Sequence, residues 1–481
     1  MRISEYFGLD RTQGSLDFVD VDTTADVPVF IDPRAIKALH SDWARDCVAL
    51  MTSFFAEVLD AIQLGDRHRV RDLLNELGEP NETHFGLSTG DRSRGRGLGS
   101  EGSEDVANML SGSDAARAGL LQNIEDTLLM VPGISSDLVS DITTHVIRGA
   151  LIGYTQTWCE YFGIPTERQW SGPVWHPDEL EWQTGDVELP RTPAGRLLLV
   201  PRSIVRVKMT FDKDQYFNGY LAPLLIRKEI DSNSDLVRRL RDGTPRVNRD
   251  DLREKYPTGK LAIVRYTIDN PEALARYREA NSSVTRPVLD HEDLSRRFDL
   301  PPPDYEELMG AIGAVSPGKH GAKAYHDSVE ALLTALLYPS LVNPKVEREI
   351  HEGRKRIDIT YDNVAERGFF HWIGLHNPAA LIPVECKNYT GDPGNPELDQ
   401  LSGRFSMQRG NVGILAVRSF VNKNLFLQRC RDTAKDGRGF IIPLDDSDLN
   451  ELAEFSAAHQ EDQKARQAFD LLRERFDYLV G

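Results

Sequence analysis

Two short segments, residues 356–361 and 381–387, constrain the fold more than any other feature of the sequence. In the first, isoleucines alternate with polar residues, a period of two that is typical of a β-strand. The second is a mostly apolar strand that ends in Glu, Cys and Lys. Because successive side chains of a strand point to opposite faces, Glu385 and Lys387 share one face of it.

Pairing of these two strands would bring Asp358 beside Glu385 and create a place for a hard metal ion. Mg²⁺ binds oxygen ligands, often one or two carboxylates, and retains several water molecules. The ammonium group of Lys387 would lie next to the ion, where it can orient or help to deprotonate an attacking water. The segments therefore predict a Mg²⁺ site, which Mn²⁺ can also fill.

A second carboxylate, Asp362, lies on the same strand face as Asp358 and is an alternative ligand. We favour Asp358 because two isoleucines embed it in the strand. Asp362 is followed by Asn363, and an Asp-Asn pair is typical of a turn.

A purely structural interpretation treats Asp358 and Glu385 as exposed strand acids, with Lys387 as their ion-pair partner. Such a surface pair contributes roughly 0 to 1 kcal/mol. It explains the sequence less well than a metal site does, because Glu385 and Lys387 end a strand that is expected to be internal. Buried carboxylates need a partner or a metal ion.

An Asp followed by Glu-x-Lys at the end of an apolar strand resembles the active site of the PD-(D/E)xK restriction-endonuclease-like superfamily. Upstream, a helix expected over 324–337 carries Glu330, where the superfamily often has a further acidic residue facing the metal. Downstream, a helix expected over 396–405 carries Gln400 and Arg404 on one face. They match a glutamine, and often a basic residue, near the scissile phosphate in that superfamily.

The resemblance covers about residues 319–450 and is strongest to the Mrr-like branch. Further segments complete the order α-β-β-β-α-β-α-β: strands expected at 412–417 and 439–443 with a helix at 422–434 between them. One departure is the 27-residue separation of the Asp and the Glu, which leaves 366–378 as an inserted strand or loop. The fold class implied is α/β, a mixed sheet flanked by helices and preceded by a larger α+β region.

The same resemblance implies residue roles for a metal-dependent deoxyribonuclease. The metal ligands would be the two carboxylates and the backbone carbonyl of Cys386, with Glu330 assisting directly or through water. Lys387 would position the nucleophilic water, while Gln400 and Arg404 would steady the phosphate. A basic patch that also faces phosphate would comprise Arg354, Lys355, Arg356, Arg404 and Arg409.

The net charge of −18 at first argues against a nucleic-acid-binding protein. Its distribution weakens that objection, because residues 321–450 carry 16 Lys and Arg against 17 Asp and Glu. The acidity lies outside the nuclease-like segment, so the net charge leaves nuclease activity open.

Composition indicates a cytoplasmic globular protein, with 40% hydrophobic and 27% charged residues. We find no run of about 18 apolar residues and no signal segment, so neither membrane insertion nor secretion is expected. The four cysteines lie far apart without a CxxC pair, which fits a reducing compartment and argues against a zinc ribbon.

At 481 residues the chain is expected to form several domains. We predict a mainly helical domain over 1–165, an α+β domain over 166–295, a proline-rich linker over 296–320, the nuclease domain over 321–455 and a C-terminal helix over 456–481.

Two further segments carry charge. The Gly- and Arg-rich segment 87–102 is expected to be a surface loop that lacks the spacing of a phosphate-binding P-loop. Residues 235–278 are expected to be mainly helical, with Arg238–Arg241 on a solvated helix face.

The resulting hypothesis is a Mg²⁺-dependent endonuclease acting on DNA in restriction or antiviral defence, with the N-terminal region for recognition or regulation. An alternative is a non-catalytic nucleic-acid-binding or scaffold protein that uses a nuclease fold. Cleavage of RNA is a third. A protein partner or a homodimer is compatible with each of them.

Overall fold

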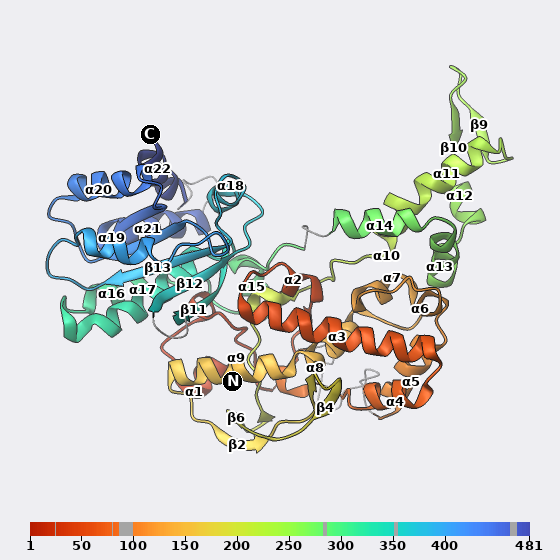
Figure 1. Cartoon of the computed structure of the whole chain (residues 1–481), viewed down its shortest axis with the longest axis horizontal. Coiled ribbons are helices and arrows are strands. Elements are labelled where there is room, and N and C mark those ends of the chain that lie inside the picture. The colour runs from red at the N-terminus through yellow and green to blue at the C-terminus, as the bar shows by residue number, and fades with distance from the viewer. Residues whose placement is uncertain (25, 79, 86–99, 282–285, 351–354, 462–468) are drawn as a thin grey trace.

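The structure, a computed structural model, describes the whole chain except residues 25, 79, 86–99, 282–285, 351–354 and 462–468 (Figure 1). Much of the expected loop 87–102, and Arg354 of the expected basic patch, lie outside the described residues. Two main hydrophobic cores organise the chain, one formed by N-terminal residues and one around a sheet near the C-terminus.

The C-terminal core surrounds a mixed five-stranded sheet in the order β11-β12-β13-β14-β15. The first three strands are antiparallel to one another, and the last two run parallel to β13. This confirms a mixed α/β protein with a mixed sheet near the C-terminus. The strands are β11 (Leu341–Ile350), β12 (Lys355–Asn363), β13 (Leu381–Lys387), β14 (Val412–Val417) and β15 (Phe440–Asp445).

Helices pack on both faces of this sheet. One group comprises α16 (Tyr305–Ala314), α17 (Ala322–Leu336) and α21 (Asp446–Glu461), which contact one another. The other comprises α18 (Gly368–His376), α19 (Asn395–Ser402), α20 (Lys423–Lys435) and α22 (Phe469–Val480). All of β14 is buried, as expected for a parallel strand covered by helices on both faces.

Three local predictions in this region are wrong. The inserted segment 366–378 contains helix α18 rather than a strand or loop, because Phe369, Phe370 and Ile373 recur at helical spacing and are buried. Asp362 and Asn363 end strand β12 instead of forming a turn. The helix expected to reach residue 405 ends at Ser402, before Gly403.

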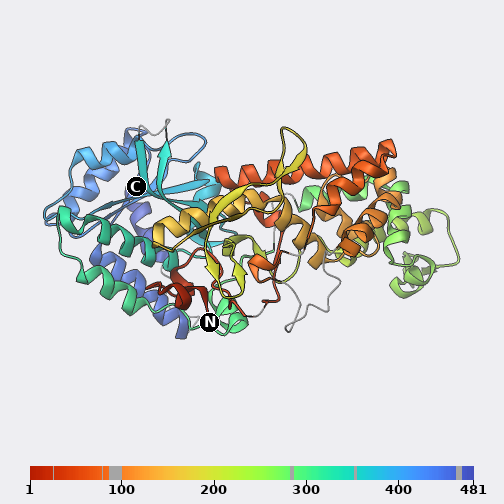
Figure 2. The ribbon, with the colours of Figure 1, turned by 90° about the horizontal axis from the view of Figure 1, so that it is seen from below.

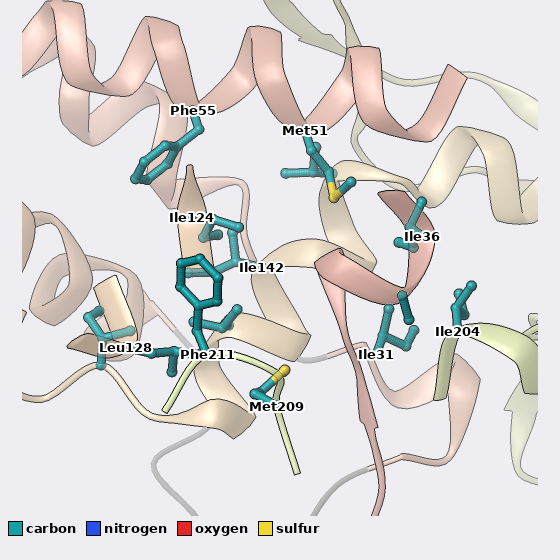
Figure 3. Close-up of a cluster of buried hydrophobic side chains, with 14 of the residues drawn as sticks. Ile31, Ile36, Met51, Phe55, Ile124, Leu128, Ile142, Ile204, Met209 and Phe211 are labelled. Carbon is teal, nitrogen blue, oxygen red and sulfur yellow. The ribbon is translucent and has the colours of Figure 1, made fainter. Parts of the chain in front are cut away.

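The N-terminal core is built mainly from helices, and its centre is the 23-residue helix α3. Figure 3 shows side chains of α3, including Met51 and Phe55, pointing into this core. The helices are α1 (Ile3–Phe7), α2 (Pro33–Lys37), α3 (Asp42–Leu64), α4 (Arg67–Asn75), α5 (Ser100–Ser111), α6 (Asp114–Arg117), α7 (Thr127–Met130), α8 (Ser136–Val146) and α9 (Arg148–Phe162).

Among the described residues, α3 is the one helix long and apolar enough to cross a membrane, judged by length and composition alone. A core helix of a soluble protein has the same properties, and nine residues of α3 are buried in the N-terminal core.

Short strands of the N-terminal unit form two-stranded sheets. Those that follow α9 are β2 (Glu167–Trp170), β3 (Val174–His176), β4 (Glu181–Gln183), β5 (Asp186–Leu189), β6 (Arg191–Thr192), β7 (Gly195–Arg196) and β8 (Val205–Arg206). Strand β8 pairs with β1 (Phe30–Ile31), which precedes α2.

An arm then projects from the N-terminal unit, away from the C-terminal sheet, as both ribbon views show (Figures 1 and 2). Its elements and the helices that lead into and out of it are α10 (Lys213–Tyr216), α11 (Ala222–Asp231), β9 (Val237–Arg239), β10 (Pro245–Val247), α12 (Arg249–Lys255), α13 (Lys260–Asp269), α14 (Pro271–Ala280) and α15 (His291–Phe298). The prediction that Arg238–Arg241 lies on a helix is wrong, because these residues form strand β9 and its turn.

Residues of the two units contact each other near the expected linker. Tyr338, which follows α17, and Val342, at the start of β11, belong to the N-terminal core. The Arg202 guanidinium lies 3.6 Å from the centre of the Tyr338 ring, and Arg202 Nη2 donates to the carbonyl of Thr334 at 3.0 Å. A buried cation from one unit is thus held by the other.

Candidate functional site

The two key carboxylates come from adjacent antiparallel strands. The register of β12 and β13 places Ile359 opposite Val384, and its continuation places Asp358 opposite Glu385. Asp358 Oδ2 accepts a hydrogen bond from the backbone N–H of Cys386 at 2.8 Å. The strands therefore fix Asp358 against the end of β13, beside Glu385.

Glu385 is held by the two residues that the sequence placed with it. Its Oε1 accepts a hydrogen bond from Lys387 Nζ at 2.8 Å and another from Nε2 of Gln400 on α19. The Glu385 side chain is fully buried, whereas Asp358 is half-buried. The structure therefore brings Asp358, Glu385, Lys387 and Gln400 together at one end of the sheet.

The electrostatics of this group favour an additional cation. Burial and the nearby Asp358 carboxylate raise the pKa of Glu385, although Lys387 opposes them. The other carboxylate oxygen, Glu385 Oε2, is buried without a hydrogen-bond partner among the described residues. A buried oxygen without a donor needs compensation, and a bound metal ion would supply it.

Lys387 keeps its proton at neutral pH. Burial lowers the pKa of its ammonium group, but the carboxylates of Glu385 and Asp358 outweigh this effect and leave the pKa raised. In this arrangement Lys387 can donate hydrogen bonds and supply positive charge, and its raised pKa does not suit it to accept a proton at neutral pH.

Glu330 has polar partners other than the carboxylate pair. It is buried on α17, where its Oε2 lies 3.1 Å from Arg11 Nη2 and accepts from the Tyr161 hydroxyl at 3.2 Å. Its Oε1 accepts from the Thr334 hydroxyl at 2.8 Å. Within the described parts of the chain, no three His, Cys, Asp or Glu side chains form a metal-binding group. Because Arg11 and Tyr161 belong to the N-terminal unit, their contacts with Glu330 join the two units.

The basic residues are only partly assembled around the site. Arg404 follows α19, is buried, and acts electrostatically on Glu385. Its carbonyl accepts from Arg409 Nε at 3.0 Å, and burial lowers the pKa of Arg409. Arg356 is exposed on β12 and forms an ion pair with Glu347 at 3.4 Å.

Asp362, the alternative ligand, is part of the unit interface. It is buried at the end of β12 and accepts from Asn343 Nδ2 at 2.9 Å. The same amide donates to Ser41, the N-cap residue of α3, at 2.9 Å. These partners place the Asp362 carboxylate toward the N-terminal unit.

Sequence reasoning missed His326, which touches the candidate site from α17. One ring nitrogen lies 3.2 Å from the carbonyl oxygen of Asp358, and the other lies 3.2 Å from Asp327 Oδ1. Burial lowers the pKa of His326, but Asp327 and Asp358 raise it by more. The sequence could have identified His326 by its position, because it lies four residues before Glu330 and therefore on the same helix face.

A cleft of about 1000 Å³ opens between α3 and α9 of the N-terminal unit and α17 and β11 of the C-terminal one. His326 and Asp327 line it, together with aromatic residues of α9. The cleft therefore reaches His326, directly beside Asp358.

Residues 8–212 match the model of a domain of unknown function, DUF8370. No curated protein and no solved structure matches the chain. The matched segment includes Arg11 and Tyr161, the partners of Glu330, and ends before the sheet that carries Asp358 and Glu385.

Proposed function

We propose that the chain is a metal-dependent endonuclease that hydrolyses phosphodiester bonds of DNA. The observation that carries the proposal is the Glu385 carboxylate, which is buried beside Asp358. Lys387 and Gln400 donate to one of its oxygens, and no described residue donates to the other. The element order around it supports a restriction-endonuclease-like fold of the Mrr-like kind, with α18 as an insertion. A cytoplasmic role in restriction or antiviral defence follows from that resemblance alone.

The residues present fit a Mg²⁺ or Mn²⁺ ion. Glu385 Oε2 and the Asp358 carboxylate would bind it, and the Cys386 backbone carbonyl is a further donor at the same strand end. When bound, the metal supplies a Lewis acid that polarises the phosphate and lowers the pKa of bound water.

The side chains around the ion have separate tasks. Lys387 donates hydrogen bonds to the attacking water or to a phosphate oxygen, and its charge offsets the negative charge that develops on the oxygens of the pentacoordinate phosphate. Gln400 fixes the Glu385 carboxylate in place. Arg404 adds positive charge from the turn after α19.

A second candidate, a non-catalytic scaffold, is favoured by one observation. Glu330, the further acidic residue expected to face the metal, is engaged by Arg11 and Tyr161 of the other unit. A scaffold has no need of the remaining set of Asp358, Glu385 and Lys387, so we rank it second.

Cleavage of supercoiled plasmid with Mg²⁺ or Mn²⁺, against EDTA, tests the proposal. We expect metal-dependent nicking that falls by at least about 100-fold in both Asp358→Asn and Lys387→Ala. Asp399→Asn is the matched control, because Asp399 is an exposed residue of α19 next to Gln400. If Asp358→Asn cleaved as fast as the wild type, or if cleavage continued in EDTA, the assigned residues would not be the catalytic site. Absence of cleavage and of any metal-induced rise in melting temperature would leave the scaffold, and cleavage of RNA alone would change the substrate.

A further inference from the structure

The arm ends in a β-hairpin. This hairpin and the first residue of helix α12 that follows it, residues 236–249, are called here the basic hairpin. Strands β9 and β10 pair in register, with Arg238 opposite Arg246 and Val237 opposite Val247. Gly243, with φ of +85°, closes the turn between them, and its N–H donates to the Leu240 carbonyl at 2.9 Å. In Figure 1 the hairpin projects at the end of the molecule opposite the C-terminal sheet.

The basic hairpin is strongly cationic in a chain whose net charge is −18. Its 14 residues include five arginines and a single acidic residue, Asp242. All five arginine side chains are exposed. The arginines are Arg238, Arg239, Arg241, Arg246 and Arg249.

The fold does not account for this charge. Arg238 and Arg246 lie directly opposite each other, and like charges in that position destabilise a two-stranded ribbon. Arg238 forms an ion pair with Asp251 at 2.8 Å, but 71% of its side chain is exposed. Across the residues that the structure describes, the other four arginines have no ion pair with a carboxylate. The exposed arginines repel one another, and few side chains of the ribbon are buried. Such a surface is suited to bind an anionic partner.

We propose that the basic hairpin binds the phosphate backbone of duplex DNA at a point away from the cleavage site. A two-stranded ribbon is narrow enough for the major groove, which is about 12 Å wide. Arginine contacts to phosphates release counterions and anchor a protein on the duplex without reading its sequence. The inference rests on the proposed function, since DNA is the substrate proposed for the site on the sheet.

The test compares two triple variants of the full-length protein in EDTA, so that binding is measured without cleavage. One variant changes Arg239, Arg241 and Arg246 to Gln, and the control changes Arg227, Lys228 and Arg276 to Gln. The control residues are exposed on helices α11 and α14 of the same arm, so both variants lose the same charge. The probe is a labelled duplex of about 40 base pairs, followed by fluorescence anisotropy at several salt concentrations.

We expect the hairpin variant to bind about 10- to 100-fold more weakly at low salt. The slope of log K against log salt should become smaller by about two to three, as the loss of three phosphate contacts requires. The control should stay within about twofold of the wild type, and melting temperatures should match.

Equal binding by the two triple variants would overturn the inference. A hairpin-dependent preference for single-stranded RNA or for anionic phospholipid vesicles over the duplex would overturn it as well. Hairpin-dependent DNA binding by a protein that cleaves nothing would refute the proposed function and leave the hairpin's role standing. If the hairpin variant still cleaved DNA and bound it normally, the hairpin's role would be refuted and the proposed function would stand.

Discussion

At the scale of single residues, the buried acids of the C-terminal unit are satisfied in different ways. Among the residues that the structure describes, Glu330 has donors on both carboxylate oxygens, whereas Glu385 has donors on one. The first is a completed structural contact. The second leaves a buried carboxylate oxygen to which the proposed metal ion would bind.

Metal binding at Glu385 predicts a gain in stability that one substitution removes. We expect Mg²⁺ or Mn²⁺ to raise the free energy of unfolding, by about 2.7 kcal/mol when the metal is at 100 times its Kd. Glu385→Gln should abolish the gain because it removes the charged ligand oxygen. Thermal unfolding over a metal titration measures it, with Glu160→Gln, an exposed change on α9, as control. An unchanged gain in Glu385→Gln would place the metal elsewhere.

Glu330→Gln separates a structural from a catalytic role for that residue. We expect it to destabilise the protein by about 1 to 3 kcal/mol, because the half-buried Arg11 loses its ion pair. Cleavage per folded molecule should fall far less than in Asp358→Asn. Urea unfolding and plasmid nicking on the same samples measure both effects, and loss of cleavage with normal stability would make Glu330 catalytic.

The sequence predicts the carboxylate pair because its information is local. Strand alternation and helix spacing are enough to align Lys387 with Glu385 and to place Gln400 on a helix face. The partners of Glu330 cannot be found this way, because Arg11 and Tyr161 are more than 160 positions distant and only tertiary packing brings them near.

At the scale of elements, strands with a strong apolar pattern were predicted almost to the residue, as β14 shows. Helix α18 lies in the segment predicted to be an inserted strand or loop. That prediction rested on the length between Asp358 and Glu385 and did not use the helical spacing of Phe369, Phe370 and Ile373. The basic hairpin was missed because a charged run suits a solvated helix as well as a ribbon. Its turn, Asp242-Gly243, is a hairpin signal that the charge run obscured.

Helix α9 offers a test of element stability at two glycines. Gly153 is in the helix interior, and a Cβ built there meets nothing within 4 Å. We expect Gly153→Ala to stabilise the protein by about 0.5 to 1 kcal/mol through reduced backbone entropy. Gly149→Ala should gain nothing or lose stability, since its Cβ would lie 2.9 Å from Val174 Cγ1. Urea unfolding of both variants checks this, and equal gains would contradict the packing of α9 on β3.

At the scale of the whole molecule, a polar network joins the two units. The Asn343 backbone N–H donates to Asp17 Oδ1 at 3.1 Å, while its side chain donates to Asp362. Asn343 has φ of +55° and lies at a bulge in β11, so the strand is distorted where it meets the N-terminal unit. Both carboxylates are buried at this contact.

This network predicts that stability depends on pH. Burial raises the pKa of Asp17 and of Asp362 to about 6, so the folded protein holds protons that the unfolded chain releases. Their contribution, at most about 3 kcal/mol each, is complete below about pH 4 and is lost as pH rises through about 6.

Asp362→Asn should reduce that loss by up to about 1.4 kcal/mol per pH unit in this window, because one titrating group is removed. Urea unfolding at several values between pH 4 and 7 measures the slope, with Asp399→Asn as the exposed control. A slope that is identical in wild type and Asp362→Asn would show that Asp362 does not titrate there.

The placement of Tyr338 and Val342 in the N-terminal core bears on how such a chain can evolve. The stretch similar to DUF8370 includes Arg202, whose guanidinium is held by Tyr338 and by the carbonyl of Thr334. A recombination that joined this stretch to a different C-terminal unit would leave the buried Arg202 guanidinium without its partners. Inheritance of the two units is therefore expected to be linked, and new partners for the N-terminal unit should retain an aromatic residue at the position of Tyr338.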